Sequence, residues 1–240
     1  MIARRLTSSV PASAIPRITR SINPTYRLAQ MSTYTASAVG ALSQKIIHDH
    51  EELDDYYHKM LSAPDVETKR KYQNQFVWEL ARHSIAEELV VYPAFEKYIT
   101  SGGKEMADKD REEHLVLKKE LYTFQGLEAT DPSFEPTIKK LYADLKQHIA
   151  EEERDDLPKL EQVIPRDESE RLAKSFQRTK MFVPTRSHPS APDKPVRAAV
   201  FLQSCNTDTF FGQPFETVAG LLAAPLDKLG DIFRSFPEKP

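Results

Sequence analysis

Apolar side chains recur every three or four residues along the middle of the chain, which is the spacing of amphipathic helices. The pattern predicts four long helices and a shorter fifth, over about residues 41–62, 66–99, 105–127, 134–156 and 167–180. Breaking residues separate the first three, at Pro64 and at Gly102-Gly103. Four helices with short connections predict an all-α fold, an up-down-up-down four-helix bundle.

The two ends of the chain depart from this pattern. We expect a basic leader over residues 1–40, the bundle over 41–165, a short extra helix over 166–183, and a proline-rich extended tail over 184–240. Helical spacing returns late in the tail, in an apolar stripe formed by Phe215, Val218, Leu222, Leu226, Leu229, Phe233 and Phe236. The stripe predicts an amphipathic helix over 215–236, which either packs on the bundle or binds a membrane or protein partner.

One motif occurs twice in the chain. The first copy starts at His83 and the second at His148, and each continues with Glu at +4 and +5, Pro at +10 and Glu at +13. A His and a Glu four residues apart lie one turn apart on the same face of a helix. Each copy therefore presents an imidazole and a carboxylate together, His83 with Glu87 and His148 with Glu152, and such mixed donors suit first-row transition metals.

The repeat extends beyond the motif. His50 precedes His83 by 33 residues and His114 precedes His148 by 34, so each hairpin of helices carries matched histidines. All four histidines fall on predicted core faces. A single buried His is usually a hydrogen-bonded core residue, but four at matched depth with two carboxylates indicate a dinuclear metal site, because two divalent ions compensate the buried negative charge.

The remaining histidines and the second glutamate of each motif receive other assignments. His48 is expected at the surface of the first helix and His188 in the tail. His58 lies at the edge of the apolar stripe, where we favour the surface over a supporting position behind the metal ligands. Glu88 and Glu153 point about a quarter turn away from Glu87 and Glu152. We expect both on the solvated face of their helices, with inward rotation as a supplementary ligand as the alternative.

Composition agrees with a helical protein and excludes several classes. The 240 residues are 40% hydrophobic and 29% charged, with only seven glycines. A net charge of −3 gives no reason to expect a nucleic-acid partner. The lone cysteine, Cys205, excludes a disulfide within the chain. No apolar run approaches the roughly 18 residues of a transmembrane helix, and no phosphate-binding glycine loop, CxxC pair or nucleophilic triad is found.

Charge is unevenly distributed along the chain. The first acidic residue is Asp49, and the basic residues before it are Arg4, Arg5, Arg17, Arg20, Arg27 and Lys45. An arginine- and serine-rich leader without acidic residues is typical of a mitochondrial transit peptide, so we expect a mitochondrial protein. The alternatives are a basic tail without a targeting role, or a cytoplasmic form that starts at Met31.

The doubled motif, together with His50 and His114, resembles hemerythrin-like proteins with the HHE cation-binding domain, particularly the fungal members. The resemblance covers about residues 41–165, and the tail segment Arg186-Ser-His-Pro-Ser is similar to the fungal type. It implies a four-helix bundle that encloses two non-haem iron ions, bridged by carboxylates and an oxygen atom. The implied metal ligands are His50, His83, Glu87, His114, His148 and Glu152.

Two departures from the oxygen-carrying hemerythrins matter. Those proteins have a second His four residues after the third-helix ligand, where this chain has Lys118, and an Asp at +5 on the fourth helix, where this chain has Glu153. The site thus offers four histidines instead of five. The internal symmetry predicts that His50 and His83 hold one metal, that His114 and His148 hold the other, and that Glu87 and Glu152 bridge both. With one solvent-derived bridge each metal would keep an open position, which favours reactions with O2, peroxide or nitric oxide over reversible O2 storage.

Three functions are compatible with these residues. The first is a dinuclear metal-binding protein, with iron as the expected metal and zinc or manganese as alternatives, that handles or senses iron and small ligands such as O2, peroxide or NO. The second is a diiron oxidase or peroxidase. The third is an adaptor that binds a protein partner through the helix at 215–236.

Overall fold

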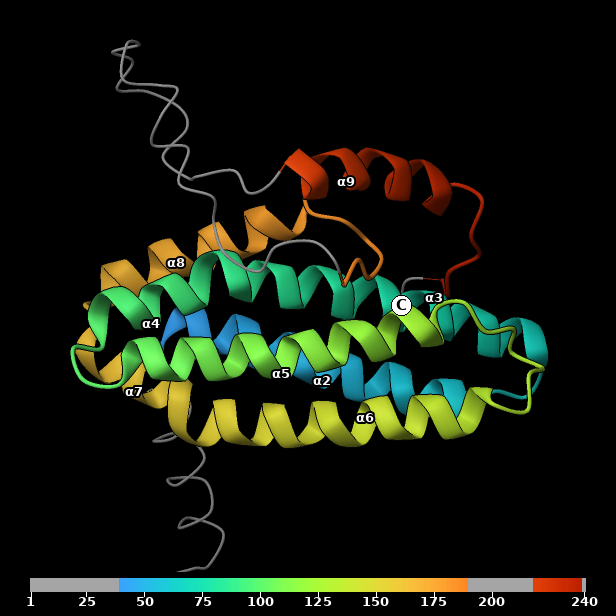
Figure 1. Ribbon diagram of the computed structural model, residues 1–240, viewed down its shortest axis with the longest axis horizontal. Coiled ribbons are helices and arrows are strands. Elements are labelled where there is room, and N and C mark those ends of the chain that lie inside the picture. Colours follow the sequence, from blue (N-terminus) through green and yellow to red (C-terminus); the bar gives the residue numbers. More distant parts are fainter. Residues whose placement is uncertain (1–38, 190–217, 239–240) are drawn as a thin grey trace, which may run out of the picture. The chain divides into compact units, whose positions relative to one another are not determined.

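The computed structural model describes residues 39–189 and 218–238, and side chains at 218–222 are outside the description (Figure 1). The predicted leader and most of the proline-rich tail lie outside the described residues, so their assignments stay predictions. Every regular element in the described part is helical, and the predicted all-α bundle is confirmed.

The elements follow the expected order. Two of them are π-helical segments, η1 and η2, each of which leads from a long α-helix into a short one. The elements are α2 (Ala41–Leu61), α3 (Val66–Ala86), η1 (Glu87–Val91), α4 (Tyr92–Tyr98), α5 (Gly103–Phe124), α6 (Phe134–Glu151), η2 (Glu152–Asp156), α7 (Leu157–Val163), α8 (Arg166–Lys180) and α9 (Val218–Asp231).

Local chemistry sets the ends of the helices. Asp65, directly after Pro64, caps α3, because its carboxylate accepts a hydrogen bond from the Thr68 amide at 2.7 Å. Gly102 separates α4 from α5 with a φ of 83°, a left-handed conformation that glycine adopts without strain. These residues turn the chain between antiparallel helices.

The two π segments occupy equivalent places in the repeat. The Tyr92 amide donates to the Glu87 carbonyl and the Leu157 amide to the Glu152 carbonyl, so each bond spans five residues. A proline follows directly in both copies, at Pro93 and Pro158. Because proline lacks an N–H and its ring crowds the carbonyl four residues back, the wider turn accommodates it.

The wider turns change the predicted boundaries. The kink expected at Pro93 takes the form of η1, and the second predicted helix continues through η1 and α4 to Tyr98. The fourth helix was expected to end near residue 156, but it continues through η2 and α7 to Val163, because Pro158 fits the first turn of α7.

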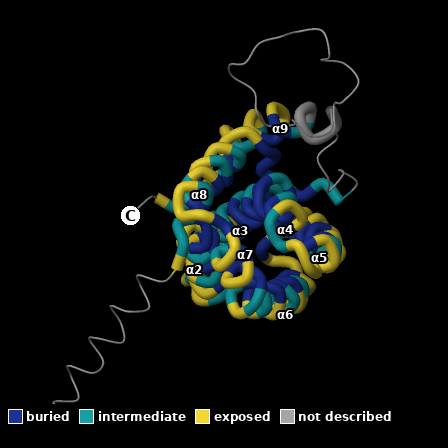
Figure 2. The backbone as a smooth tube through the Cα atoms, turned by 90° about the vertical axis from the view of Figure 1, so that its left-hand side faces the viewer, coloured by how far each residue is buried: buried dark blue, intermediate teal, exposed yellow. Residues whose placement is uncertain are grey.

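Two hairpins form the bundle. The first pairs α2 with α3 and the second pairs α5 with α6, while contacts of α3 with α5 and of α2 with α6 join the hairpins. Figure 2 shows the buried segments of these helices turned toward a common interior, with exposed segments outside. The extra helix α8 packs on the outside of α2 and α3.

The interior has two apolar clusters. One packs around Leu53, Phe76 and Phe124, and the other around Ile46, Phe95, Leu160 and their neighbours. In sequence, His50, His83 and His114 each fall between residues of the first cluster and residues of the second, and the helix of His148 continues from the first cluster to Leu157 and Leu160 of the second. The polar layer is thus enclosed by apolar side chains at both ends.

The C-terminal helix α9 lies with its apolar stripe outward. Leu226, Leu229 and Phe233 are exposed, Phe233 by 88%, whereas Asp227 is buried. Its attachment is largely polar, since the Asp227 carboxylate accepts hydrogen bonds from the Thr185 and Arg186 amides at 3.2 Å. Of the stripe residues whose side chains are described, Leu226, Leu229 and Phe233 thus face outward, whereas the Phe236 ring lies 6.4 Å from that of Trp78 on α3. The choice between packing on the bundle and binding a membrane or partner stays a prediction.

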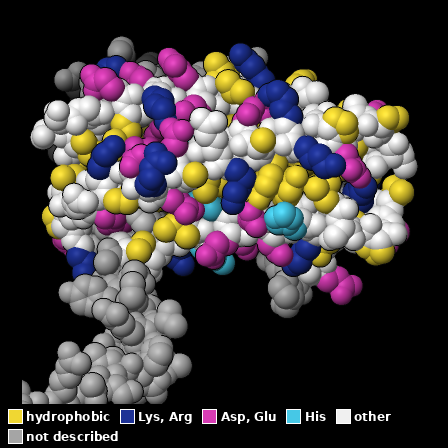
Figure 3. Space-filling model, turned by 90° about the horizontal axis from the view of Figure 1, so that it is seen from below, with side chains coloured by type: hydrophobic (Ala, Val, Ile, Leu, Met, Phe, Trp, Pro, Cys, Tyr) yellow, Lys and Arg dark blue, Asp and Glu magenta, His cyan; other side chains and the backbone are white. Residues whose placement is uncertain are grey.

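The surface carries both charges. Seen from below, on the side where α6 lies, acidic and basic side chains are interspersed (Figure 3). Many of them form ion pairs one turn apart, such as Lys140 with Asp144 at 3.0 Å. Among the helices of the described residues, none is both long enough and apolar enough to span a bilayer.

Candidate metal centre

Each long helix of the bundle contributes one histidine to a buried layer. His50 comes from α2, His83 from α3, His114 from α5 and His148 from α6, and all four are buried. The carboxylates of Glu87 and Glu152 join them. Both glutamates are the first residue of a π segment and have no exposed surface.

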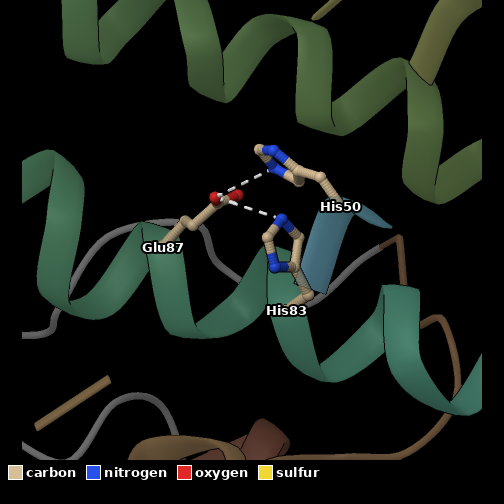
Figure 4. A group of neighbouring side chains, drawn as sticks. All are labelled: His50, His83 and Glu87. Atoms are coloured by element: carbon tan, nitrogen blue, oxygen red, sulfur yellow. Dashed lines mark ion pairs between the residues drawn. The ribbon is translucent and has the colours of Figure 1, made fainter. Parts of the chain in front are cut away.

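Glu87 lies between the two pairs of histidines. Its Oε1 is 3.1 Å from His83 Nε2 and 4.0 Å from His50 Nε2, and its Oε2 is 3.3 Å from His114 Nε2. Figure 4 shows the His50 and His83 rings directed at this carboxylate. One carboxylate thus faces imidazoles from three helices.

The other ligands predicted from the sequence complete the layer. Glu152 Oε2 is 3.4 Å from His50 Nε2, and the Nε2 atoms of His114 and His148 are 3.1 Å apart. Ligand atoms of two trios lie within 4.8 Å of one another, with Glu87 common to both: His50, His83 and Glu87, and Glu87, His114 and His148. The structure therefore brings all six residues together.

The donor atoms at the centre of this layer lack partners. Both oxygens of Glu87, both oxygens of Glu152 and Nε2 of His50 are buried without a hydrogen bond. Unpaired buried polar atoms are rare in native proteins because each one costs desolvation energy. Convergent nitrogen and oxygen lone pairs of this kind fit bound cations.

The opposite nitrogen of each ring faces a second carboxylate. We call these four the outer carboxylates. The distances to Nδ1 are 2.8 Å for His50 with Glu153, 3.2 Å for His83 with Asp49, 3.3 Å for His114 with Glu88, and 2.8 Å for His148 with Glu113. An Nδ1–H that donates to a carboxylate leaves the Nε2 lone pair free and directed inward, as metal-binding histidines require.

The outer carboxylates obey the same pseudo-two-fold symmetry as the histidines. Asp49 and Glu113 each precede a histidine and bind the other histidine of their own hairpin, whereas Glu88 and Glu153 reach across to the opposite hairpin. The solvated placement expected for Glu88 is wrong, since only 1% of it is exposed. Half-buried Glu153 also turns inward, onto His50.

Lysines neutralise three of the outer carboxylates. Lys118 Nζ is 2.6 Å from Glu88, and Lys109 Nζ is 2.9 Å from Glu113. Lys180, from α8, donates to both Asp49 and Glu79. Lys118 stands where the oxygen-carrying hemerythrins have a fifth histidine, and here it supports His114 through Glu88.

Protons perform part of the compensation when no cation is bound. Burial, reinforced by the charges of Glu87 and Asp110, raises the pKa of Glu152 well above its usual range. Burial also acts against ionisation of Glu87, but the neighbouring His83 and His114 hold its pKa well below the usual range. Burial disfavours the charged form of His83 as well, yet Glu87 and Asp49 raise its pKa to about 10. Cations would displace these protons.

The sequence interpretation missed three residues beside the site. Tyr92 is buried, with its hydroxyl 2.8 Å from His114 Nε2. Asp110 and Asp156 are buried on the same side, and burial together with the Asp156 charge raises the pKa of Asp110 to about 7. A comparison of the two repeats could have found them, because each polar residue has an apolar equivalent in the opposite hairpin. The equivalents of Tyr92, Asp110 and Asp156 are Leu157, Ile46 and Val91, respectively.

Comparison with known proteins agrees with this geometry. The family model of the hemerythrin HHE cation binding domain matches residues 41–160. An uncharacterized hemerythrin-like protein of Schizosaccharomyces pombe is 50% identical over 196 residues, which are 82% of this chain and 88% of that protein. This chain belongs to the hemerythrin HHE family.

A solved structure is also similar to this chain. The crystal structure of a hemerythrin HHE cation binding domain-containing protein from Mycobacterium kansasii is 21% identical, covers 58% of this chain and 86% of its own, and gives a TM-score of 0.49. The HHE domain, together with the clustered histidines and glutamates, implies a metal-binding site in this chain.

Proposed function

We propose that this chain is a dinuclear iron-binding protein that handles or senses iron and small ligands such as O2, peroxide or nitric oxide. The observation that carries the proposal is the placement of Glu87. This fully buried carboxylate has no hydrogen-bond partner and lies 3.1 Å and 3.3 Å from one imidazole of each histidine pair.

The proposed ligands divide between the two hairpins. His50 and His83 hold one ion, and His114 and His148 hold the other. Glu87, whose two oxygens face one imidazole of each pair, would bind both ions, and Glu152 would supply the second carboxylate. The four outer carboxylates support this division, because each one orients a single imidazole with its Nε2 inward.

The choice of iron rests on the family resemblance and on the donors. Mixed nitrogen and oxygen donors also suit manganese and zinc. Iron would supply a reversible change of oxidation state and coordination positions for a small ligand. The protein itself contributes apolar clusters on both sides of the polar layer, which limit access to small molecules.

Metal content is the direct test. Elemental analysis of the purified full-length protein should give about two iron ions per chain, with near-ultraviolet absorption that differs under air and argon. His83→Ala should lose at least half of this metal. The matched control is His58→Ala, an exposed histidine of the same hairpin. Well under one metal per chain, without further loss in His83→Ala, contradicts the proposal.

A diiron oxidase or peroxidase is the second candidate, and Tyr92 favours it. A buried phenol 2.8 Å from His114 Nε2 can donate a hydrogen bond beside the site, and burial first, then the charge of Glu87, raises its pKa well above the usual range, so that it keeps its proton. Turnover of a reductant with O2 or peroxide should then fall at least tenfold in Tyr92→Phe with metal content unchanged. Equal rates in both proteins argue against this candidate.

The mitochondrial location is a separate proposal. It rests on the basic, acid-free composition of residues 1–40. A reporter fused to these residues should enter mitochondria, and a fusion in which Arg4, Arg5, Arg17, Arg20 and Arg27 are replaced by Gln should remain outside. A diffuse signal from the unaltered fusion rejects the proposal.

A further inference from the structure

A second group of carboxylates lies beside the His114 and His148 half of the centre. Asp110 on α5 and Asp156 on η2 are buried, and Glu113 is one turn further along α5. Ligand atoms of Asp110, Glu113 and His148 lie within 4.8 Å of one another. This group, which we call the acidic cluster, thus touches the outer side of a proposed ligand.

The acidic cluster contains an unpaired buried oxygen. Only 1% of Asp110 is exposed, yet its Oδ2 has no hydrogen-bond partner. A buried carboxylate oxygen without a partner costs desolvation energy unless a proton or a cation compensates it. Asp156 adds a second carboxylate to the same environment, and the charges of both act on Glu152 in the centre.

The solvent exposure of the carboxylates decreases from the outer edge of the cluster toward the centre. The side chain of Glu113 is 30% exposed, whereas Asp110 and Glu152 are buried. Lys109 closes the outer edge, since its Nζ lies 2.9 Å from Glu113, 2.7 Å from Glu151 and 4.0 Å from Asp110. Because the Lys109 side chain is 50% exposed, it can move into water when a cation takes its place.

Two comparisons within the molecule set this cluster apart. In the other hairpin, the positions equivalent to Asp110 and Asp156 hold Ile46 and Val91, which are buried in an apolar cluster. Another acidic group, formed by Asp49, Glu52 and Glu79, already holds the buried ammonium of Lys180, which donates to two of its members.

We propose that the acidic cluster is a loading site, which captures a divalent metal ion from solvent and passes it to the His114 and His148 half of the centre. This inference rests on the proposed dinuclear function. Three carboxylates attract a divalent cation, and the imidazoles of the centre then bind a transition metal more tightly than oxygen ligands alone. The ion replaces the ammonium of Lys109 at Glu113 and supplies the partner that Oδ2 of Asp110 lacks.

Metal uptake by the metal-free full chain tests the loading site. Co²⁺ is mixed with the protein, and the visible absorption of the bound ion gives the rate of uptake. The final metal content is measured once the absorption is constant. In Asp110→Asn and Asp156→Asn, one of the two ions should bind at least tenfold more slowly than in the wild type. Two ions should still be bound at the end. The wild-type rate should fall with added salt more steeply than the variant rates.

The matched control is Glu112→Gln, which removes one negative charge from an exposed position of the same helix. It should leave the rate within twofold of the wild type. Circular dichroism and thermal unfolding of the metal-free variants establish that they fold, as expected for an isosteric change that removes a buried charge.

The outcomes separate the two proposals. Wild-type uptake rates in Asp110→Asn and Asp156→Asn overturn the loading site alone. A lower final metal content in these variants, with an unchanged rate for the remaining ions, also overturns it, because the carboxylates would then be ligands of the bound state. Absence of Co²⁺ binding by the wild type overturns the proposed function and the loading site together.

Discussion

The two halves of the buried centre share their ligands but differ in their surroundings. The half with His50 and His83 is lined one turn away by Ile46 and Val91, whereas the half with His114 and His148 has Asp110 and Asp156 at the equivalent positions. The hydroxyl of Tyr92 also lies on the second side. The repeat thus preserves the donors and varies the polarity around them, which makes the two proposed metal positions chemically different.

The largest expected effect comes from removing the carboxylate that the halves share. Glu87→Gln should lose nearly all bound metal, because Glu87 faces one imidazole of each pair. Glu152→Gln should lose less, since its one close contact with a described imidazole is with His50 at 3.4 Å. Elemental analysis at saturating metal measures both. Equal losses would show that the carboxylates are equivalent despite their different contacts.

Next in size are losses confined to one half. His83→Ala and His148→Ala should each reduce the metal content from about two ions to about one, because each ring belongs to a different trio of ligand atoms. The Co²⁺ absorption spectra of the two variants should differ, since the remaining ion lies in apolar surroundings in one and acidic surroundings in the other. Identical spectra would contradict the asymmetry of the halves.

Outer carboxylates should have a smaller effect. Asp49→Asn and Glu113→Gln should each weaken metal affinity by about 10- to 100-fold, as is usual when the partner of a metal-bound histidine is removed. Asp49→Asn should also lower thermal stability, because Lys180 loses one of its two buried carboxylate partners. Competition with a chelator measures the affinity. Unchanged affinity in both variants would indicate that the outer carboxylates do not orient the rings.

The last prediction concerns the metal-free protein and the pH dependence of its stability. Burial and Asp156 raise the pKa of Asp110 to about 7. Between about pH 4 and pH 7 Asp110 is therefore more protonated in the folded state than in the unfolded state, and its contribution to the free energy of unfolding falls as pH rises through this range. Asp110→Asn should reduce the pH-dependent decrease in the free energy of unfolding by about 1–3 kcal/mol. Urea unfolding with a chelator at pH 5 and pH 8 measures it, and parallel pH profiles would contradict it.

Much of the site could be predicted from one sequence. A helical period of 3.6 residues fixes the direction of each side chain on its own helix, so spacing alone placed His83 with Glu87 and His148 with Glu152. The repeat then related His50 and His114 to them. The fold class and the family resemblance that followed from these residues are confirmed.

Other features depend on which helix lies opposite a given face. Glu88 was expected in solvent because it points away from Glu87, but in a bundle that direction leads to His114 and Lys118 on α5. Lys180 is 131 residues from Asp49 and still binds it, through the packing of α8 on α2. The proline positions indicated a kink, whereas the π segments were visible only in the backbone hydrogen bonds.

By itself the sequence determined the helices, their apolar faces and the set of inward donors, because these follow from spacing along one chain. The tertiary structure decided which carboxylate meets which imidazole, where lysines neutralise charge, and where an oxygen such as that of Asp110 is left unpaired. The physical reason is that hydrogen bonding and charge compensation depend on distances between helices, which no single helix encodes.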